Sequence, residues 1–154
     1  MGRSPSDPFQ LRIKANGPDA NLVDVGYGVS QSLPIVVDSV LSPKEQILVV
    51  QQPEVHLHPK AQAALGSFFV EQVKEKKNFV IETHSDYLLD RIRMEVAKKN
   101  IKPEDVQIVY LERQGLDVKV HSLSLDDLGN ITNAPPGYRA FFLEEEMRLL
   151  SRGA

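Results

Sequence analysis

The chain has 154 residues, of which 42% are hydrophobic and 25% are charged, and these values are typical of one folded domain rather than of a disordered chain. The 18 basic and 21 acidic residues give a net charge of −3, which argues against a protein that binds nucleic acid through bulk positive charge. The absence of cysteine excludes disulfides, thiolate zinc sites and cysteine nucleophiles. No apolar run reaches the length of a membrane span or a signal-peptide core, so we expect a cytoplasmic protein with no membrane partner.

The amino-terminal part of the chain predicts little regular structure. Residues 1–8 are small and polar and include prolines, which is typical of a disordered leader. A short half-buried strand is expected next, because apolar residues alternate with polar ones at Phe9, Leu11 and Ile13. Residues 16–19 carry Asn, Gly, Pro and Asp, a composition that predicts a turn.

Three helices and two strands are expected in alternation along the middle of the chain. Pro34 is compatible with the first helix if it lies in the first turn. Residues 47–50 form a β-branched run that predicts a strand buried on both faces. Pro59 begins the second helix, and Thr83 or Ser85 caps the third. The expected ranges are 29–41, 47–50, 59 to about 74–77, 79–81 and 88–96.

The last third of the chain predicts a β-hairpin and then an amphipathic helix. Residues 106–112 and 118–123 alternate between apolar and polar, with a turn at Gln114-Gly115, and residues 138–150 have helical spacing. We therefore expect an α/β fold with a largely parallel sheet, flanking helices and a C-terminal β-hairpin. The expected division is a leader at 1–8, a lobe at 9–125 and a C-terminal extension at 126–154.

The candidate chemistry lies in three segments. Ligands of parallel sheets bind beyond the carboxyl ends of the strands, and the two loops expected there, residues 51–58 and 82–86, contain three of the four histidines. A glycine-rich segment also precedes the first helix, and its backbone N–H groups can bind an anion. It contains Gly26, Gly28, Ser30 and Gln31.

Together these segments resemble the C-terminal lobe of an ABC-type ATPase head of the OLD-, RecF- and SMC-like kind, often called AAA family ATPases. The resemblance covers residues 21–123. Residues 26–34 resemble the signature motif, residues 49–54 resemble the Walker B strand and its exit, and residues 83–85 resemble the switch loop. The resemblance implies ATP and magnesium as cofactors. It also implies that Gly26, Gly28, Ser30, Gln31 and His84 contact nucleotide, with Ser30 reaching the γ-phosphate held by the opposite protomer.

Two departures from the family pattern limit this interpretation. The motif Gly-x-x-x-x-Gly-Lys-Ser/Thr does not occur in the chain, so a Walker A lobe has to come from another chain or from an upstream segment. Gln51 and Gln52 stand where related heads commonly carry acids. An amide oxygen holds magnesium weakly and cannot take a proton from water, so we expect Gln51 to be a weak magnesium ligand and hydrolysis to be impaired. The expected catalytic set is Gln51, Gln52, Glu54 and His84.

Three hypotheses follow from these observations. In the first, the chain is the ATP-binding lobe of a homo- or heterodimeric ATPase, an ATP hydrolase only when a Walker A lobe completes it, with nucleic acid contacted through the full complex in DNA repair or phage defence. In the second, it is a non-catalytic regulatory or interaction module derived from such an ATPase. In the third, it is a metal-dependent hydrolase that uses the alternating side chains of Glu54, His56 and His58.

Overall fold

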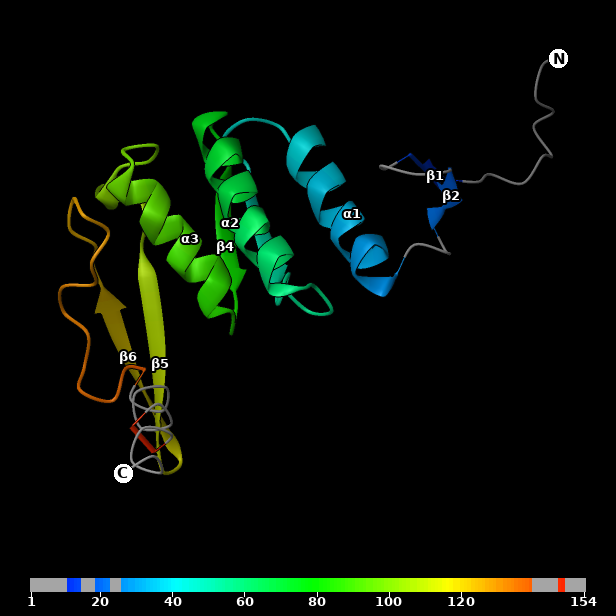
Figure 1. Ribbon diagram of the computed structural model, residues 1–154. Helices are drawn as coiled ribbons and strands as arrows, with labels where there is room; N and C mark the ends of the chain where they lie inside the picture. Colours follow the sequence, from blue (N-terminus) through cyan, green and yellow to red (C-terminus); the bar gives the residue numbers. More distant parts are fainter. Residues whose placement is uncertain (1–10, 15–18, 23–25, 140–146, 149–154) are drawn as a thin grey trace, which may run out of the picture. The chain divides into compact units, whose positions relative to one another are not determined.

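The computed structural model describes residues 11–14, 19–22, 26–139 and 147–148, and it confirms the α/β class (Figure 1). The strands described form three two-stranded sheets, of which β3–β4 is parallel and β1–β2 and β5–β6 are antiparallel. The parallel pair and the C-terminal hairpin were both expected. The elements are β1 Arg12–Ile13, β2 Ala20–Asn21, α1 Tyr27–Leu41, β3 Ile47–Gln51, α2 Pro59–Lys74, β4 Asn78–Glu82, α3 Asp86–Ala97, η2 Pro103–Asp105, β5 Ile108–Gln114 and β6 Asp117–Leu123.

The chain divides into two compact units, residues 1–92 and 93–154, and each is described by itself. The division falls within α3. The predicted domain limits, with boundaries after residues 8 and 125, stay a prediction.

The core of the first unit lies between its helices and one face of the β3–β4 sheet. Leu65, Phe69 and Leu88 form the buried cluster. The partly buried residues packed against it come from both strands and from the helices, and include Ile35, Val50, Phe79, Ile81 and Ile92. Burial of these apolar side chains holds the helices on the strands at roughly 25 cal/mol for each Å² removed from water.

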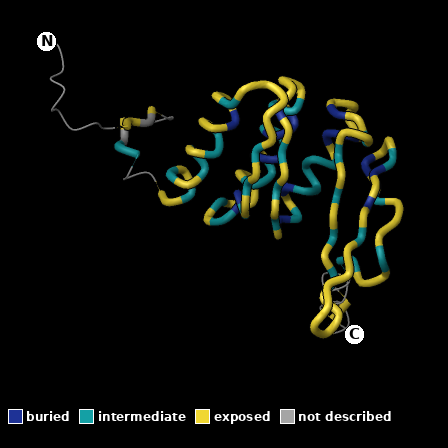
Figure 2. The backbone as a smooth tube through the Cα atoms, turned by 180° about the vertical axis from the view of Figure 1, so that it is seen from behind, coloured by how far each residue is buried: buried dark blue, intermediate teal, exposed yellow. Residues whose placement is uncertain are grey.

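The opposite face of the β3–β4 sheet is uncovered. Ile47, Val49 and Val80 are 62%, 78% and 57% exposed, and the strand positions alternate between exposed and partly buried (yellow and teal in Figure 2). The prediction that the 47–50 strand is buried on both faces is therefore wrong for this chain. The reason is that the core residues contributed by the helices meet only the face that carries Val50, Phe79 and Ile81.

Helix α1 begins earlier than predicted and runs through a proline. It starts at Tyr27 rather than at residue 29, so Pro34 lies inside the helix and not in the first turn. Proline has no N–H to donate to the carbonyl of Ser30, and a proline in a helix interior costs roughly 3 kcal/mol. The helix continues because Ile35 packs against the core and because the buried Ser39 hydroxyl donates to the Ile35 carbonyl at 2.7 Å.

The starts of α2 and α3 confirm the predicted capping residues. Pro59 is the first residue of α2, and the ring Nδ1 of His58 accepts the N–H of Lys60 at 3.3 Å. At α3 the Ser85 hydroxyl oxygen accepts the N–H of Leu88 at 3.1 Å, which makes Ser85 the cap. Local chemistry therefore determines where both helices begin.

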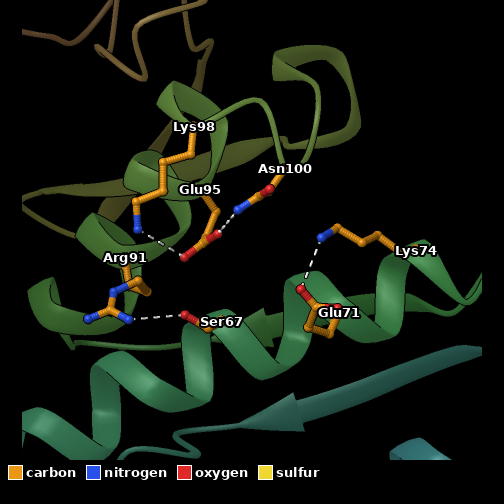
Figure 3. Close-up of polar contacts among 7 residues, drawn as sticks. All are labelled: Ser67, Glu71, Lys74, Arg91, Glu95, Lys98 and Asn100. Atoms are coloured by element: carbon orange, nitrogen blue, oxygen red, sulfur yellow. Dashed lines mark hydrogen bonds and ion pairs between the residues drawn. The ribbon is translucent and has the colours of Figure 1, made fainter.

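Helices α2 and α3 approach closely at Gly66. A Cβ placed on Gly66 would lie 2.8 Å from the carbonyl oxygen of Leu88, so a larger residue does not fit without movement. Next to this contact, Arg91 Nη1 on α3 donates to Ser67 Oγ on α2 at 3.1 Å (Figure 3). Close packing at Gly66 and the hydrogen bond between Arg91 and Ser67 thus both hold the two helices together.

The second unit is built on the β5–β6 hairpin. Gln114 pairs with Asp117, and Gly115 has φ +65°, a left-handed conformation that suits glycine in a tight hairpin turn. Strand β5 begins at Ile108 rather than at residue 106 because Pro103–Asp105 forms a 3₁₀ turn. The His121 ring Nε2 lies 2.8 Å from Glu112 Oε2 across the hairpin.

Several predicted features fall outside the described residues. These are the leader at 1–8, Phe9, most of the turn at 16–19 and most of the helix at 138–150. Within the last range, Met147 and Arg148 are described and helical, whereas Tyr138 and Arg139 lie in a turn in which Arg139 has φ +57°. The prediction that the helix starts at about residue 138 is therefore wrong. None of the described helices combines the length and apolar character needed to cross a membrane.

Candidate functional site at the carboxyl edge of the parallel strands

Parallel pairing brings the two candidate loops to one edge of the β3–β4 sheet. Gln51 pairs with Glu82 at the carboxyl ends of the strands. The N–H of Gln52 donates to the Glu82 carbonyl at 2.8 Å and extends the ladder by one step. His84 follows with an exposed side chain. The structure therefore places Gln51, Gln52 and His84 at the same sheet edge.

Glu82 adds a carboxylate that the predicted catalytic set omitted. Gln51 and Glu82 are register partners, and both are exposed at the ends of their strands. In a β-strand alternate residues share a face, so their side chains lie on the uncovered face with Val49 and Val80. From the sequence, Glu82 is a candidate substitute for the missing acids, and strand alternation places it on the same face as Val80, whereas its register with Gln51 comes from the structure.

Glu54 links the 51–58 loop to the 82–86 loop. Glu54 is buried, with only 8% of its surface exposed. Glu54 Oε1 accepts the backbone N–H of His84 at 2.8 Å, a contact between residues that are 30 positions apart. Glu54 Oε2 is also buried but has no hydrogen-bond partner in the described part of the chain. A buried polar atom left unsatisfied costs roughly 1–3 kcal/mol or more.

Gln62 forms another link between the same loops. Its Nε2 donates to the Leu57 carbonyl at 2.9 Å, and its Oε1 accepts the Ser85 hydroxyl at 2.6 Å. Gln62 was not among the expected site residues because it lies inside α2 rather than in a loop. Its only signal is a position one turn beyond His58, where a helical side chain can reach back to the preceding loop.

The amino-terminal end of α1 contacts the 51–58 loop. A Cβ on Gly28 would lie 2.6 Å from the His56 carbonyl oxygen, so this position requires glycine for close backbone approach. The ring of Tyr27 meets the ring of His56 edge-on, with centroids 4.7 Å apart. The sequence predicted that Gly28 binds an anion. The structure adds a packing role for this glycine against the 51–58 loop.

The other residues of the glycine-rich segment lie on either side of Gly28. Gly26 precedes α1 with φ +30°, and the helix has no side-chain cap there. The Ser30 hydroxyl donates to the Leu22 carbonyl at 3.3 Å, and Gln31 is exposed. The structure thus brings Gly28 against the 51–58 loop at His56, whereas Ser30 and Gln31 lie two and three residues further along α1.

The predicted metal cluster of Glu54, His56 and His58 is wrong. Over the ranges that the structure describes, no three His, Asp or Glu side chains gather as a metal site would require. The three residues have separate structural roles. Glu54 bonds to His84, His56 packs on Tyr27, and His58 caps α2.

The donor set at this edge does fit a hydrated magnesium ion. Magnesium prefers oxygen ligands, keeps several of its waters and is commonly held by one or two carboxylates and substrate phosphates. The edge offers the unpartnered Glu54 Oε2, the exposed Glu82 carboxylate and the amide oxygen of Gln51. A fully protein-bound cation would need more ligands than these.

Two comparisons relate the chain to known proteins. The family AAA_21, described as "AAA domain, putative AbiEii toxin, Type IV TA system", matches residues 12–90, just over half of the chain. A solved structure from work on the structural biochemistry of ATP-driven dimerization and DNA-stimulated activation of SMC ATPases is also similar. Its TM-score is 0.60 at 18% identity, over 93% of this chain and 74% of that one. No curated protein matches the chain.

Proposed function

Because this chain belongs to the AAA_21 family of AAA domains and shares the fold of an SMC ATPase, we propose that it is the lobe of an ABC-type ATPase that carries the signature segment and the Walker B strand. In this proposal, a Walker A lobe from elsewhere completes the nucleotide site. The observation that carries the proposal is the hydrogen bond from the His84 N–H to Glu54 Oε1, at 2.8 Å, which joins the Walker B exit to the switch loop. ABC-type sites need these two loops at one place, because one serves the cation and the other the terminal phosphate.

The residues of the carboxyl edge would divide the work of holding magnesium and ATP. His84 would contact the γ-phosphate, and the magnesium ion would neutralise phosphate charge. Gln51 would be a weak ligand for that ion, with Glu54 and Glu82 as the nearby carboxylates. Gln52 would orient water without taking its proton, and losing a general base costs about 10²–10⁴-fold in rate. We therefore propose slow hydrolysis and persistent ATP binding.

The amino-terminal end of α1 would serve a second protomer. Gly26, Gly28, Ser30 and Gln31 would present backbone N–H groups and side chains to the ATP held by that protomer, and the uncapped helix start supports this role. The similar SMC ATPases are described as dimerizing when driven by ATP and as activated by DNA. For this chain we propose an ATP-dependent homo- or heterodimer, with nucleic acid contacted through the full complex.

The uncovered face of the β3–β4 sheet supports a missing lobe. Ile47, Val49 and Val80 are large, β-branched and more than half exposed. A contiguous exposed apolar surface on a sheet favours association with another structure or self-association. We propose that the Walker A lobe extends or covers this sheet.

The test is to produce the full chain together with the P-loop-bearing lobe encoded beside or upstream of it, and to measure Mg-ATP binding and hydrolysis. Gln52→Glu should raise hydrolysis by about 10²-fold or more if position 52 holds the attacking water, because glutamate can take the proton that glutamine cannot. Gln46→Glu makes the same chemical change just before β3, at the opposite end of the strand, and should leave the rate unchanged. A completed complex that binds no ATP would refute the proposal.

A non-catalytic interaction module is the second candidate, favoured by the two amides at positions 51 and 52. It predicts that the chain captures its partner lobe with the same affinity whether or not Mg-ATP is present. Ser30→Ala and His84→Ala would then leave capture unchanged, whereas the ATPase proposal predicts that both weaken ATP-dependent dimerization.

A further inference from the structure

Glu54 is the most unusual polar side chain at the carboxyl edge. Its residue is 8% exposed, yet one of its two carboxylate oxygens has a partner and the other has none among the described residues. Carboxylates are rarely this buried unless both oxygens are paired. A buried acceptor that a fold leaves open is a candidate for a ligand contact, because a ligand can satisfy it on binding.

The backbone around Glu54 directs its side chain inward. Gln52 and His56 have positive φ angles of 44° and 63°, which bend the chain before and after Glu54. Within this bend the Val55 N–H donates to the Gln52 carbonyl at 3.2 Å, and the Leu57 N–H donates to the Glu54 carbonyl at 3.0 Å. The bend is thus stabilised by its own hydrogen bonds, and it sets the position of the Glu54 carboxylate.

Glu54 Oε1 controls the backbone at His84. A hydrogen bond from an N–H to a carboxylate is about twice as strong as one to a neutral acceptor. Gln52 and Gln62 add two other links between the loops, but neither bonds to His84. The Glu54 contact therefore determines the position of the His84 backbone, from which the exposed side chain extends.

We propose that Glu54 is a positioning residue, which fixes His84 through Oε1 and offers Oε2 to a water of the hydrated magnesium ion that arrives with ATP. Phosphate groups of a nucleotide carry no donor for Oε2, whereas a magnesium-bound water does. The first part stands on the geometry of this chain. The second part rests on the proposed function.

The positioning role can be tested on the full chain by NMR of the His84 backbone amide. Glu54→Ala removes the acceptor, so we expect the His84 amide proton to shift upfield and to exchange with solvent about tenfold faster or more. Glu54→Gln keeps an acceptor oxygen and should restore the protection to within about threefold. Glu71→Gln, which alters an exposed carboxylate paired with Lys74 (Figure 3), is the matched control and should leave His84 unchanged.

The role of Oε2 is tested in the complex completed by the P-loop lobe. Glu54→Gln replaces this oxygen with an amide NH₂ group, so Mg-ATP affinity should fall about tenfold, while ADP without magnesium binds as in the unsubstituted complex. Unchanged Mg-ATP affinity would overturn the Oε2 assignment. If Glu54→Ala does not fold, Glu54→Met, which keeps the side-chain length without an acceptor, replaces it in the His84 amide measurement, and Glu54→Gln still decides the role of Oε2.

The positioning role of Glu54 and the proposed ATPase function can be refuted separately. A His84 amide that is unaffected by Glu54→Ala would refute the positioning role even if the complex is an ATPase. A complex that binds no nucleotide would refute the proposed function, while the His84 amide measurement on the nucleotide-free chain would still support the Glu54 link.

Discussion

The two ends of the β3–β4 sheet contrast in how fully their buried polar groups are satisfied. At the amino end, Lys77 is only 7% exposed, and its Nζ donates to the Ser42 carbonyl and, at 3.3 Å, to the Ser42 hydroxyl. Asn78 adds hydrogen bonds to the carbonyls of Gln46 and Glu45 at 3.1 and 3.3 Å. At the carboxyl end, Glu54 is equally buried but keeps one oxygen unpartnered in the described structure.

Backbone conformation does not distinguish the two ends. Glu45 and Lys76 at the amino end have φ angles of 67° and 65°, and Gln52 and His56 at the carboxyl end have angles of 44° and 63°. Left-handed residues at the amino end serve tight connections, since the Glu45 N–H donates to the Lys76 carbonyl at 2.6 Å. Positive φ angles alone therefore do not mark a site in this sheet, whereas a buried acceptor without a partner does.

The largest expected effect on stability comes from replacing Lys77, the buried and hydrogen-bonded lysine at the amino end of the sheet. Lys77→Met keeps the aliphatic length but leaves the Ser42 groups without their donor, so the free energy of unfolding should fall by about 2 kcal/mol. Urea unfolding followed by circular dichroism measures the change. Lys74→Met removes an exposed lysine paired with Glu71 and should cost less than about 0.5 kcal/mol. Equal effects of the two variants would contradict the contrast between buried and exposed lysines.

Gly28→Ala should give the next largest effect, at the contact between α1 and the 51–58 loop. The added Cβ would meet the His56 carbonyl oxygen at 2.6 Å, and overpacking of this kind costs about 1–3 kcal/mol. Alanine would otherwise favour the helix, so a net loss of stability identifies the clash. Ser32→Ala on the same helix is the control and should change the unfolding midpoint little. A stabilised Gly28→Ala variant would show that α1 does not approach the loop this closely.

The Glu112 carboxylate provides a pH-dependent reference for Glu54, because its Oε2 accepts hydrogen bonds from His121 and Gln114. The hydrogen bond from His121 holds the pKa of Glu112 below its ordinary value of 4.5. Because the folded-state pKa is lowered, the stabilisation is complete above about pH 4.5 and is lost as the pH falls through the folded value. NMR titration of the hairpin amides should show this loss, and Glu112→Gln should abolish it. Glu104→Gln, at an exposed carboxylate, should leave the hairpin titration as it is.

The smallest expected effect is that of Glu54→Gln on stability. The variant keeps an acceptor for the His84 N–H and exchanges one unpartnered buried atom for another, so the free energy of unfolding should change by less than about 0.5 kcal/mol. Thermal unfolding measures this. A loss as large as that of Lys77→Met would mean that both Glu54 oxygens are satisfied in solution and that the two sheet ends do not differ.

Much of the local structure was predictable because its signals lie close together in the chain. Pro59 at a first helical position, Ser85 as a cap and Gly115 in the hairpin turn each act within a few residues. The carboxyl edge was predictable as a place, since the carboxyl ends of parallel strands meet at one sheet edge. Its chemistry was predictable only in outline, because which side chains meet depends on contacts between distant residues.

The sequence by itself determined the order of helices and strands, the glycine-rich segment, the two candidate loops and the absence of a P-loop motif within these 154 residues. Only the tertiary structure decided that one face of β3–β4 stays uncovered and that Glu54 bonds to a backbone amide 30 residues away. It also separated Glu54, His56 and His58 into different roles. Local periodicity and capping act within a turn or a strand, whereas burial and partner choice depend on which segments the folded chain brings together.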